Sequence, residues 1–181
     1  MKRAIVSVPH PVLSTPAKRI TTFDKKLHDL VAVMTDTLLV TVNPKGVGLA
    51  ATQIGVGSQV FITKPNAQSA VRVFINPIIL DRDPSVTDGV PERGNKLEGC
   101  LSIPNVWGKV KRTTKLKLQY QDETGEIHVE EFSGFLATII QHETDHINGI
   151  LFTQRVLEQK GKLYQVGKDD EGKEELQELT I

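Results

Sequence analysis

The sequence lacks several features that would assign it to a class at once. Its 181 residues contain one cysteine, Cys100, so an intramolecular disulfide is excluded. Basic and acidic residues number 22 each, and the net charge of zero gives no overall basic field for nucleic acid or an anionic membrane. No apolar run approaches the ~18 residues of a membrane-spanning helix. Pro9 and Pro11 interrupt the N-terminal segment early, and it resembles neither a signal peptide nor a transit peptide. We therefore expect a cytosolic, enzyme-sized domain.

The residues that are present are typical of a globular protein. Hydrophobic residues make up 39% of the chain and charged residues 24%. A chain of this length buries a sizeable core without disulfides. We expect one domain over residues 1–181, in which residues 155–181 form a C-terminal hairpin tail that turns at 170–172.

Two segments have the apolar spacing of helices. Apolar residues recur every three to four positions across residues 23–40, which predicts a helix opened by Thr21 or Thr22. A second helix is expected over residues 134–148, with Ser133 as its cap.

Other segments alternate apolar and polar residues or are rich in β-branched residues, which predicts strands. These are residues 59–63 and 71–80, and a hairpin of 115–121 and 126–132 around the turn 122–125. The sum is an α+β fold: a mainly antiparallel sheet, one helix wrapped by strands and another helix in front.

The second helix contains the sequence His-Glu-Thr-Asp-His at residues 142–146. His142 and His146 lie one turn apart on one face, so both imidazoles can reach the same metal ion. The carboxylate of Glu143, next to the first histidine, can take a proton from water. The pattern alone also fits an ordinary polar helix face. The apolar residues 135–140 favour a buried helix, however, whose histidines and acids need partners that a metal supplies.

A catalytic metal site of this kind needs a third protein ligand. Downstream lie Glu158 and an acidic tail but no histidine, whereas Cys100 lies upstream in Glu-Gly-Cys-Leu-Ser-Ile-Pro. A lone cysteine is also commonly a small buried hydrophobe. Gly99 and Pro104 indicate a shaped turn around Cys100, which favours the ligand interpretation.

A third segment, residues 46–53, reads Gly-Val-Gly-Leu-Ala-Ala-Thr-Gln. Its spacing fits neither a dinucleotide fingerprint nor a phosphate-binding loop. The glycines permit close backbone approach to a ligand, and the Gln53 amide could donate to an oxyanion. Such a stretch is also typical of tight packing.

These three segments, in this order, resemble the peptide deformylase family. Its motifs are G-Φ-G-Φ-A-A-x-Q, E-G-C-Φ-S and Q-H-E-x-D-H, where Φ is apolar, and here they occupy residues 46–53, 98–102 and 141–146. Residues 9–13 and 148–152 are also similar to the family, so the resemblance spans roughly residues 5–155. It implies one catalytic domain with antiparallel sheets around a buried metal-ligand helix. The reaction it implies removes the formyl group from N-formylmethionine at the start of nascent chains.

The resemblance implies a role for each matched residue. Cys100, His142 and His146 would bind one divalent metal ion, with Fe2+ as the native ion and Zn2+, Ni2+ or Co2+ as substitutes. Glu143 would be the general acid and base. Gln53 would stabilise the oxyanion.

Further roles concern the peptide. The backbone N–H of Leu101 would join Gln53 at the oxyanion, and Val47 and Gly48 would offer backbone partners to the substrate. By helix spacing, Ile139 and Phe135 share the face of His142, so with Val47 they predict an apolar pocket for the methionine side chain. Ordinary core packing explains each of these apolar residues equally well when it is taken singly.

The sequence departs from the family in two places. Many relatives have a basic residue shortly after the E-G-C-Φ-S-x-P segment, whereas here residues 105–107 are Asn-Val-Trp. Trp107 either covers the substrate peptide or simply packs against the rest of the protein. Some relatives end in a long basic helix suited to ribosomal RNA, but this tail is acidic, so that docking mode is not carried over. A pair of Arg112 and Asp145 is expected to orient the ligand helix.

The expected partner is an N-formylmethionyl peptide. Transient ribosome association is allowed, and neither a membrane nor a specific nucleic acid is expected. The expected location is the bacterial cytoplasm or, after removal of any transit peptide, an organelle. Two alternatives stay open: a generic two-histidine zinc peptidase in which Cys100 has no role, and a non-catalytic α+β binding module.

Overall fold

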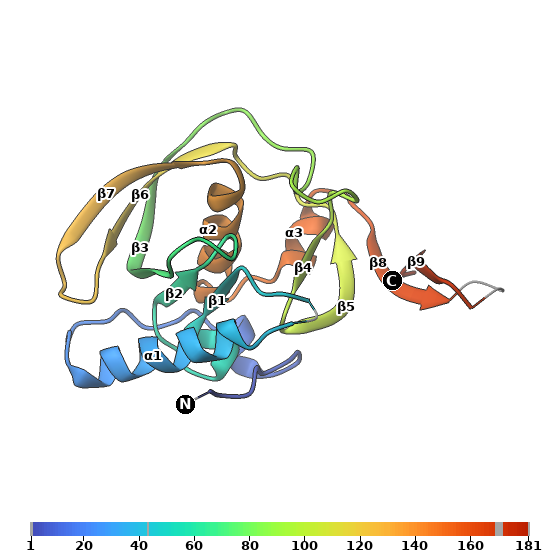
Figure 1. The fold of residues 1–181 in the computed structure, drawn as a ribbon. Helices are drawn as coiled ribbons and strands as arrows, with labels where there is room; N and C mark the ends of the chain where they lie inside the picture. The colour runs from blue at the N-terminus through green and yellow to red at the C-terminus, as the bar shows by residue number, and fades with distance from the viewer. Residues whose placement is uncertain (1, 43, 169–171, 181) are drawn as a thin grey trace.

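Two antiparallel sheets and one buried helix form the framework of the computed structural model, which describes residues 2–42, 44–168 and 172–180 (Figure 1). The first sheet has the strand order β1-β2-β3-β6-β7. Its strands are β1 (Gly48–Ala50), β2 (Val60–Thr63), β3 (Arg72–Arg82), β6 (Lys115–Gln121) and β7 (Ile127–Ser133). The second sheet has the order β4-β5-β8-β9. Its strands are β4 (Glu98–Cys100), β5 (Ile103–Gly108), β8 (Leu163–Lys168) and β9 (Glu174–Glu178). The expected α+β class is confirmed.

In the described residues, three α-helices accompany the sheets. They are α1 (Lys25–Leu39), α2 (Gly134–Ile147) and α3 (Phe152–Glu158), together with the 3-10 turns Pro11–Ser14 and Ala51–Ile54. The first sheet curves around α2, and α1 lies in front of it (Figure 1). Among the described residues, no helix combines the length and the apolar character that crossing a membrane requires.

The position of α2 follows from its apolar face. Ala137, Ile140 and Ile147 are buried against a cluster from the first sheet that includes Phe61 and Phe74. A helix of this kind is held mainly by burial of its apolar side chains, and a fully buried isoleucine such as Ile140 stabilises the fold by roughly 1.5–3 kcal/mol. The remaining face of α2, with its histidines, is therefore free to turn toward the second sheet.

The helix boundaries differ from the sequence expectation at two caps. Helix α1 begins at Lys25, not after Thr21 or Thr22, because the Asp24 carboxylate accepts hydrogen bonds from the backbone N–H groups of Lys26 and Leu27 at 3.0 and 3.2 Å. Ser133 occupies the N-cap position of α2, as expected, but its side chain makes no capping hydrogen bond.

The predicted hairpin is confirmed as β6 and β7, which pair from Lys115↔Ser133 to Gln121↔Ile127. At its turn, the Asp122 carboxylate accepts from the backbone N–H groups of Thr124 and Glu126 at 2.8 and 3.1 Å. Local turn chemistry therefore fixes the register of this pair.

The region around Cys100 forms a short turn between two strands. Cys100 ends β4 and pairs with Ile103, the first residue of β5. Pro104 follows this turn and lies exposed as the second residue of β5. A proline is tolerated near the start of a strand because the N–H it lacks is not needed there.

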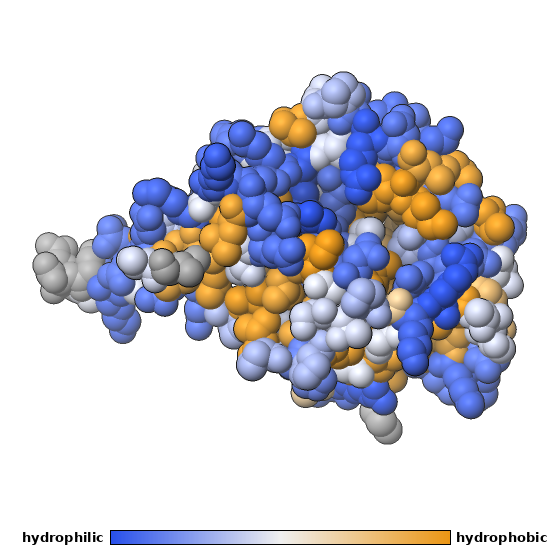
Figure 2. All heavy atoms as spheres, turned by 180° about the vertical axis from the view of Figure 1, so that it is seen from behind, coloured by the Kyte–Doolittle hydropathy of each residue, from blue (hydrophilic) through white to orange (hydrophobic). Residues whose placement is uncertain are grey.

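The C-terminal segment extends the second sheet. Strand β9 pairs with β8 from Tyr164↔Glu178 to Lys168↔Glu174, and the two strands project from the body of the molecule (Figures 1 and 2). The expected turn at 170–172 lies largely outside the described residues. The tail was expected to begin at residue 155, but residues 155–158 belong to helix α3, which begins at Phe152, so the hairpin starts only with β8 at Leu163.

Candidate metal centre and active site

Three potential metal ligands come together from two elements. Cys100 lies at the end of β4, and His142 and His146 lie one turn apart on α2. One ligand atom from each lies within 4.8 Å of the other two, and Cys100 Sγ lies 3.1 Å from His146 Nε2. Cys100 and His146 are buried and His142 is partly buried. The sulfur and two imidazoles thus surround one point at the base of a pocket.

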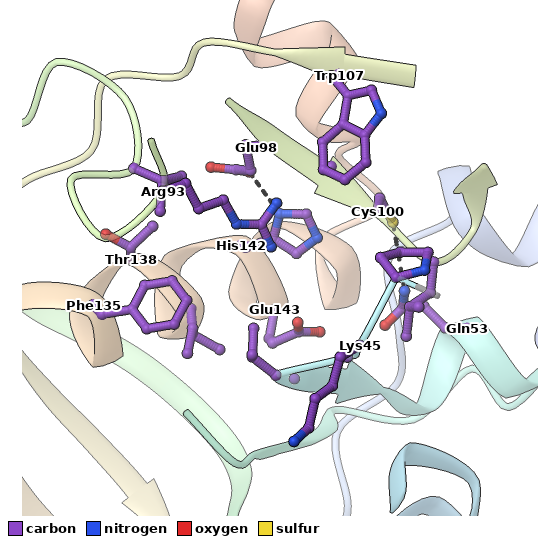
Figure 3. A pocket seen from close by; sticks show the side chains of 18 residues that line it. Lys45, Gln53, Arg93, Glu98, Cys100, Trp107, Phe135, Thr138, His142 and Glu143 are labelled. Carbon is purple, nitrogen blue, oxygen red and sulfur yellow. Dashed lines mark hydrogen bonds and ion pairs between the residues drawn. The ribbon is translucent and has the colours of Figure 1, made fainter. Parts of the chain in front are cut away.

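The orientation of His142 is set by a buried carboxylate. Glu98 Oε1 lies 2.6 Å from His142 Nδ1, an interaction drawn as a dashed line in Figure 3. The Arg112 guanidinium holds the same carboxylate through bonds of 2.7 Å to Oε1 and 3.2 Å to Oε2. A carboxylate that binds one ring nitrogen of a histidine leaves the other, here Nε2, as the nitrogen available to a metal ion.

Arg112 also connects this carboxylate to the helix. Its NH1 group donates to Asp145 Oδ2 at 2.6 Å, and Arg155 donates to Asp145 Oδ1 at 2.7 Å. The expected Arg112–Asp145 pair is therefore present, buried, and part of a larger network that includes Glu98. This network ties β4 to α2 without using the ligand atoms themselves.

The charges around the site favour the ionised forms of Glu98 and Cys100. Burial opposes ionisation of Glu98, but the charges of Arg112 and His142 outweigh it and hold the Glu98 pKa well below its ordinary value. Burial likewise opposes ionisation of Cys100, yet His146 and His142 lower its pKa to about 5. A thiolate at neutral pH is the form of cysteine that binds metals.

Glu143 has the opposite environment. It is 3% exposed, and burial raises its pKa to about 7 against the opposing charges of His142 and His146. Its Oε2 has no hydrogen-bond partner among the described residues. A carboxyl group with a pKa near neutrality can both accept and donate a proton.

Gln53 presents its amide group to the same point. Its Oε1 accepts from the backbone N–H of Ala50 at 2.9 Å, which orients Nε2 toward Cys100 Sγ at 3.5 Å and Ser102 Oγ at 3.4 Å (Figure 3). The amide is buried and its rotation is fixed. Leu101, in the turn after Cys100, also lines the pocket.

The structure gathers the sequence-predicted residues in one place. Nine of the ten line one pocket: Val47, Gly48, Gln53, Cys100, Leu101, Phe135, Ile139, His142 and Glu143. The tenth, His146, contacts Cys100 beneath it. Gly48 is required for space, because a Cβ there would lie 2.8 Å from Ile139 Cγ2 and would collide with the Glu143 carboxylate. The roles expected for these residues stay predictions.

Sequence reasoning missed four polar residues of the pocket: Lys45, Arg93, Glu98 and Thr138. Glu98 was part of a motif but received no role, although residues two apart on a strand share a face, and this spacing relates Glu98 to Cys100. Arg93 reaches the pocket from a polar loop that gave no sequence signal. Trp107 lines the pocket and packs against Gly99, which confirms the packing expectation, whereas its role over a bound peptide stays a prediction.

A second group of potential ligands lies at the β6–β7 turn. Asp122, Glu126 and His128 place donor atoms within 4.8 Å of one another. Asp122 Oδ2 is already bonded to His128 Nε2 at 2.8 Å, and the group is partly exposed. Turn formation accounts for it.

Comparison with known proteins assigns the chain to a family. The model of the polypeptide deformylase family matches residues 2–162. Peptide deformylase 1 of Bacillus cereus is 40% identical over 154 residues, which cover 84% of this chain and 90% of that protein. Its counterpart from Bacillus subtilis is 38% identical, covering 85% and 89%.

Solved structures give the same result. A peptide deformylase from Thermotoga maritima superposes with a TM-score of 0.76 at 34% identity, covering 86% of this chain and 97% of that one. A class I type b peptide deformylase from Acinetobacter baumannii, bound to Met-Ala-Ser, gives 0.75 at 31% identity, covering 86% and 98%. The chain therefore belongs to the polypeptide deformylase family of hydrolases, which remove the formyl group from N-formylmethionine. The match ends at residue 162, so the strands β8 and β9 lie beyond it.

Proposed function

We propose that Cys100, His142 and His146 hold one divalent metal ion and that Glu143 moves the protons of deformylation. One observation supports this most directly: a thiol and two imidazoles converge within 4.8 Å at a pocket that also contains the buried, unpartnered carboxyl oxygen of Glu143. A generic peptidase needs no cysteine at this position, and a non-catalytic module needs no unpaired carboxyl group.

The donor set fits a divalent transition metal. Thiolate and imidazole suit iron and zinc, and a three-ligand set leaves a position open. We propose Fe2+ as the native ion, with Zn2+, Ni2+ or Co2+ able to replace it. When bound, the ion supplies Lewis-acid chemistry by polarising the formyl carbonyl group. Metal analysis after purification without oxygen tests the choice of ion.

Glu143 performs the proton transfers in this proposal. Its Oε2 takes a proton from the attacking water and returns it to the amine nitrogen as the C–N bond breaks. The buried position keeps the carboxyl group dry, and the contact with Gly48 limits its movement. Formate and a free methionine amine are the products.

Gln53 and Leu101 stabilise the charge that develops on the formyl oxygen. The fixed Gln53 Nε2 and the backbone N–H of Leu101 are the donors, and removal of one such donor typically costs about 10²–10³ in rate. Val47, Phe135 and Ile139 hold the methionine side chain, and the backbone of Gly48 pairs with the peptide. The Acinetobacter relative bound to Met-Ala-Ser supports a peptide of this kind as the ligand.

The ligand and base assignments are tested with two variants. Cys100→Ala is expected to lose metal and activity together. Glu143→Gln is expected to keep a stoichiometric metal ion and to lose about 10²–10⁴ in kcat. Stoichiometric metal with normal activity in Cys100→Ala would refute the first assignment, and near-normal kcat in Glu143→Gln would refute the second.

The substrate is tested by comparing formyl-Met-Ala-Ser with acetyl-Met-Ala-Ser and formyl-Gly-Ala-Ser. The acetyl peptide carries a methyl group beside the crowded carbonyl site, so its kcat/KM is expected to be at least about 10²-fold lower. The glycine peptide leaves the methionine pocket empty and should also be slower. Equal rates on formyl and acetyl peptides, or cleavage of casein at internal bonds, would favour the generic peptidase.

We further propose that the protein acts on nascent chains, in a bacterial cytoplasm or an organelle, and contacts the ribosome only transiently. Co-sedimentation with translating ribosomes, compared at low and high salt, tests that contact. The acidic strand β9 gives no basic surface for ribosomal RNA.

A further inference from the structure

Arg93 places a guanidinium group at the pocket from outside the motifs. It belongs to the loop between β3 and β4, and its side chain extends into the pocket from the side of Glu98 and His142 (Figure 3). The guanidinium carbon lies 5.5 Å from the centroid of the Trp107 ring. That ring packs on the backbone of Gly99, its partner across the β4–β5 ladder. Stacking on a fixed ring limits the positions that the guanidinium can adopt.

The described residues compensate the charge of Arg93 only in part. In the described part of the chain, its one hydrogen bond is long, from NH1 to the backbone carbonyl of Leu97 at 3.4 Å. Among residues 2–42, 44–168 and 172–180, no carboxylate lies within ion-pair distance of it. The nearby Glu98 carboxylate is occupied by Arg112 and His142. Burial accordingly lowers the pKa of Arg93, with only partial compensation from the charge of Glu98.

The other charged residues of the pocket do not supply the missing anion. Glu143 is committed to proton transfer in the function proposed above, and Lys45 adds a second positive charge on the opposite side (Figure 3). Lys45 is exposed, whereas Arg93 is half buried. A partly desolvated guanidinium forms stronger charge-assisted hydrogen bonds than an exposed ammonium group.

We propose that Arg93, positioned by Trp107, is a specificity-determining residue that favours formylated peptides with an acidic side chain in the residues after methionine. This inference rests on the proposed function, because it concerns the part of the peptide that extends beyond the formyl and methionine groups. A carboxylate satisfies the planar fork of arginine with two parallel hydrogen bonds, and a lysine at the same place is repelled.

The test uses two peptide series, formyl-Met-Xaa-Ser and formyl-Met-Ala-Xaa, in which Xaa is Glu, Gln or Lys. All peptides have amidated C-termini, so that a terminal carboxylate cannot replace the side chain. At 50 mM salt, kcat/KM in one of the series is expected to fall about threefold from Glu to Gln and about threefold again from Gln to Lys. Raising the salt to 0.5 M should reduce the differences in kcat/KM within this series, because salt screens the exposed part of the interaction.

Arg93→Gln is expected to abolish the difference between Glu and Lys peptides, and Arg93→Lys to retain part of it. Lys96→Gln is the matched control: it lies in the same loop and loses the same charge, but it pairs with Asp88 at 3.6 Å and does not line the pocket. Its selectivity should equal that of the unmodified protein. If Arg93→Gln does not fold, the proposal is tested by the salt dependence of the unmodified protein and by the selectivity of Arg93→Lys between Glu and Lys peptides.

Equal kcat/KM across both series would overturn the proposal. So would a uniform loss of rate on all peptides in Arg93→Gln, since that indicates a role in loop structure alone. These results differ from failure of the proposed function, in which the neutral formyl-Met-Ala-Gln amide itself is not deformylated.

Discussion

Replacement of Arg112 by methionine tests the network behind the candidate metal site. The guanidinium is 5% exposed and makes three hydrogen bonds, two to Glu98 and one to Asp145. Methionine fills much of the same volume but leaves both carboxylates without this partner. Arg155 still holds Asp145, whereas Glu98 keeps only His142.

The expected loss of stability follows from this asymmetry. Breaking a buried ion pair by removing one partner typically costs about 3–5 kcal/mol, because an uncompensated charge stays buried. The free energy of unfolding should fall by about 3 kcal/mol, near the low end, since Asp145 keeps Arg155. A protein of ordinary stability, about 5–15 kcal/mol, still folds after this loss.

Urea unfolding of the metal-free protein measures the effect, with Lys115→Met as the control. Lys115 pairs with Glu131 at 2.8 Å, but the two side chains are 49% and 59% exposed. An exposed pair of this kind contributes about 1 kcal/mol or less. Metal affinity should also fall about 10–100-fold in Arg112→Met, because Glu98 no longer holds His142 in place.

The double variant Arg112→Met, Glu98→Gln gives the sharpest outcome. If an unpaired buried charge causes the loss, removing that charge should make the double variant more stable than Arg112→Met alone. A double variant of lower stability, or a loss in Arg112→Met no larger than in Lys115→Met, would falsify the argument.

Two further predictions concern single positions. Gly48→Ala should reduce kcat at least about tenfold with little effect on metal content, because its Cβ displaces the Glu143 carboxyl group; unchanged kcat would contradict this crowding. The hydrogen bond that His128 donates to the Asp122 carboxylate raises the pKa of His128 above its ordinary 6.5, so the stability from this pair is complete below that value and is lost as the pH rises through the raised pKa. An NMR titration should show a lower His128 pKa in Asp122→Asn, and an unchanged pKa would reject the pairing.

The parts of the site that could be predicted are those governed by local periodicity. The spacing of His142 and His146 places both on one face of a helix whatever surrounds it. The burial of α2 was likewise readable from its apolar residues 135–140. The hairpin of β6 and β7 followed from alternation and from Asp122 at its turn.

The parts that could not be predicted depend on long-range pairing. Strands β4 and β8 are both neighbours of β5, yet they lie about a third of the chain apart, and short strands give little periodicity. Cys100 was assigned as a ligand through the resemblance, whereas its approach to α2 requires β4 to be in place. Arg93 gave no signal, because a loop residue reaches a pocket only through the path of its loop.

Removal of the metal ion tests whether the ion is needed for activity alone or also for the fold. The two large hydrophobic clusters contain none of the three ligands, and only Cys100 contributes to the third cluster. The Glu98–Arg112–Asp145 network further joins β4 to α2 without a metal ion. Chelation should therefore abolish activity while the far-ultraviolet circular dichroism stays unchanged. The melting temperature should fall, since an ion present at about 1,000 times its Kd stabilises the folded state by ~4 kcal/mol. Added Fe2+, Ni2+ or Zn2+ should restore the melting temperature in the unmodified protein but not in Cys100→Ala. Loss of secondary structure on chelation would show that the metal holds the fold together, as it does in small zinc domains, and that the buried network alone does not keep β4 against α2.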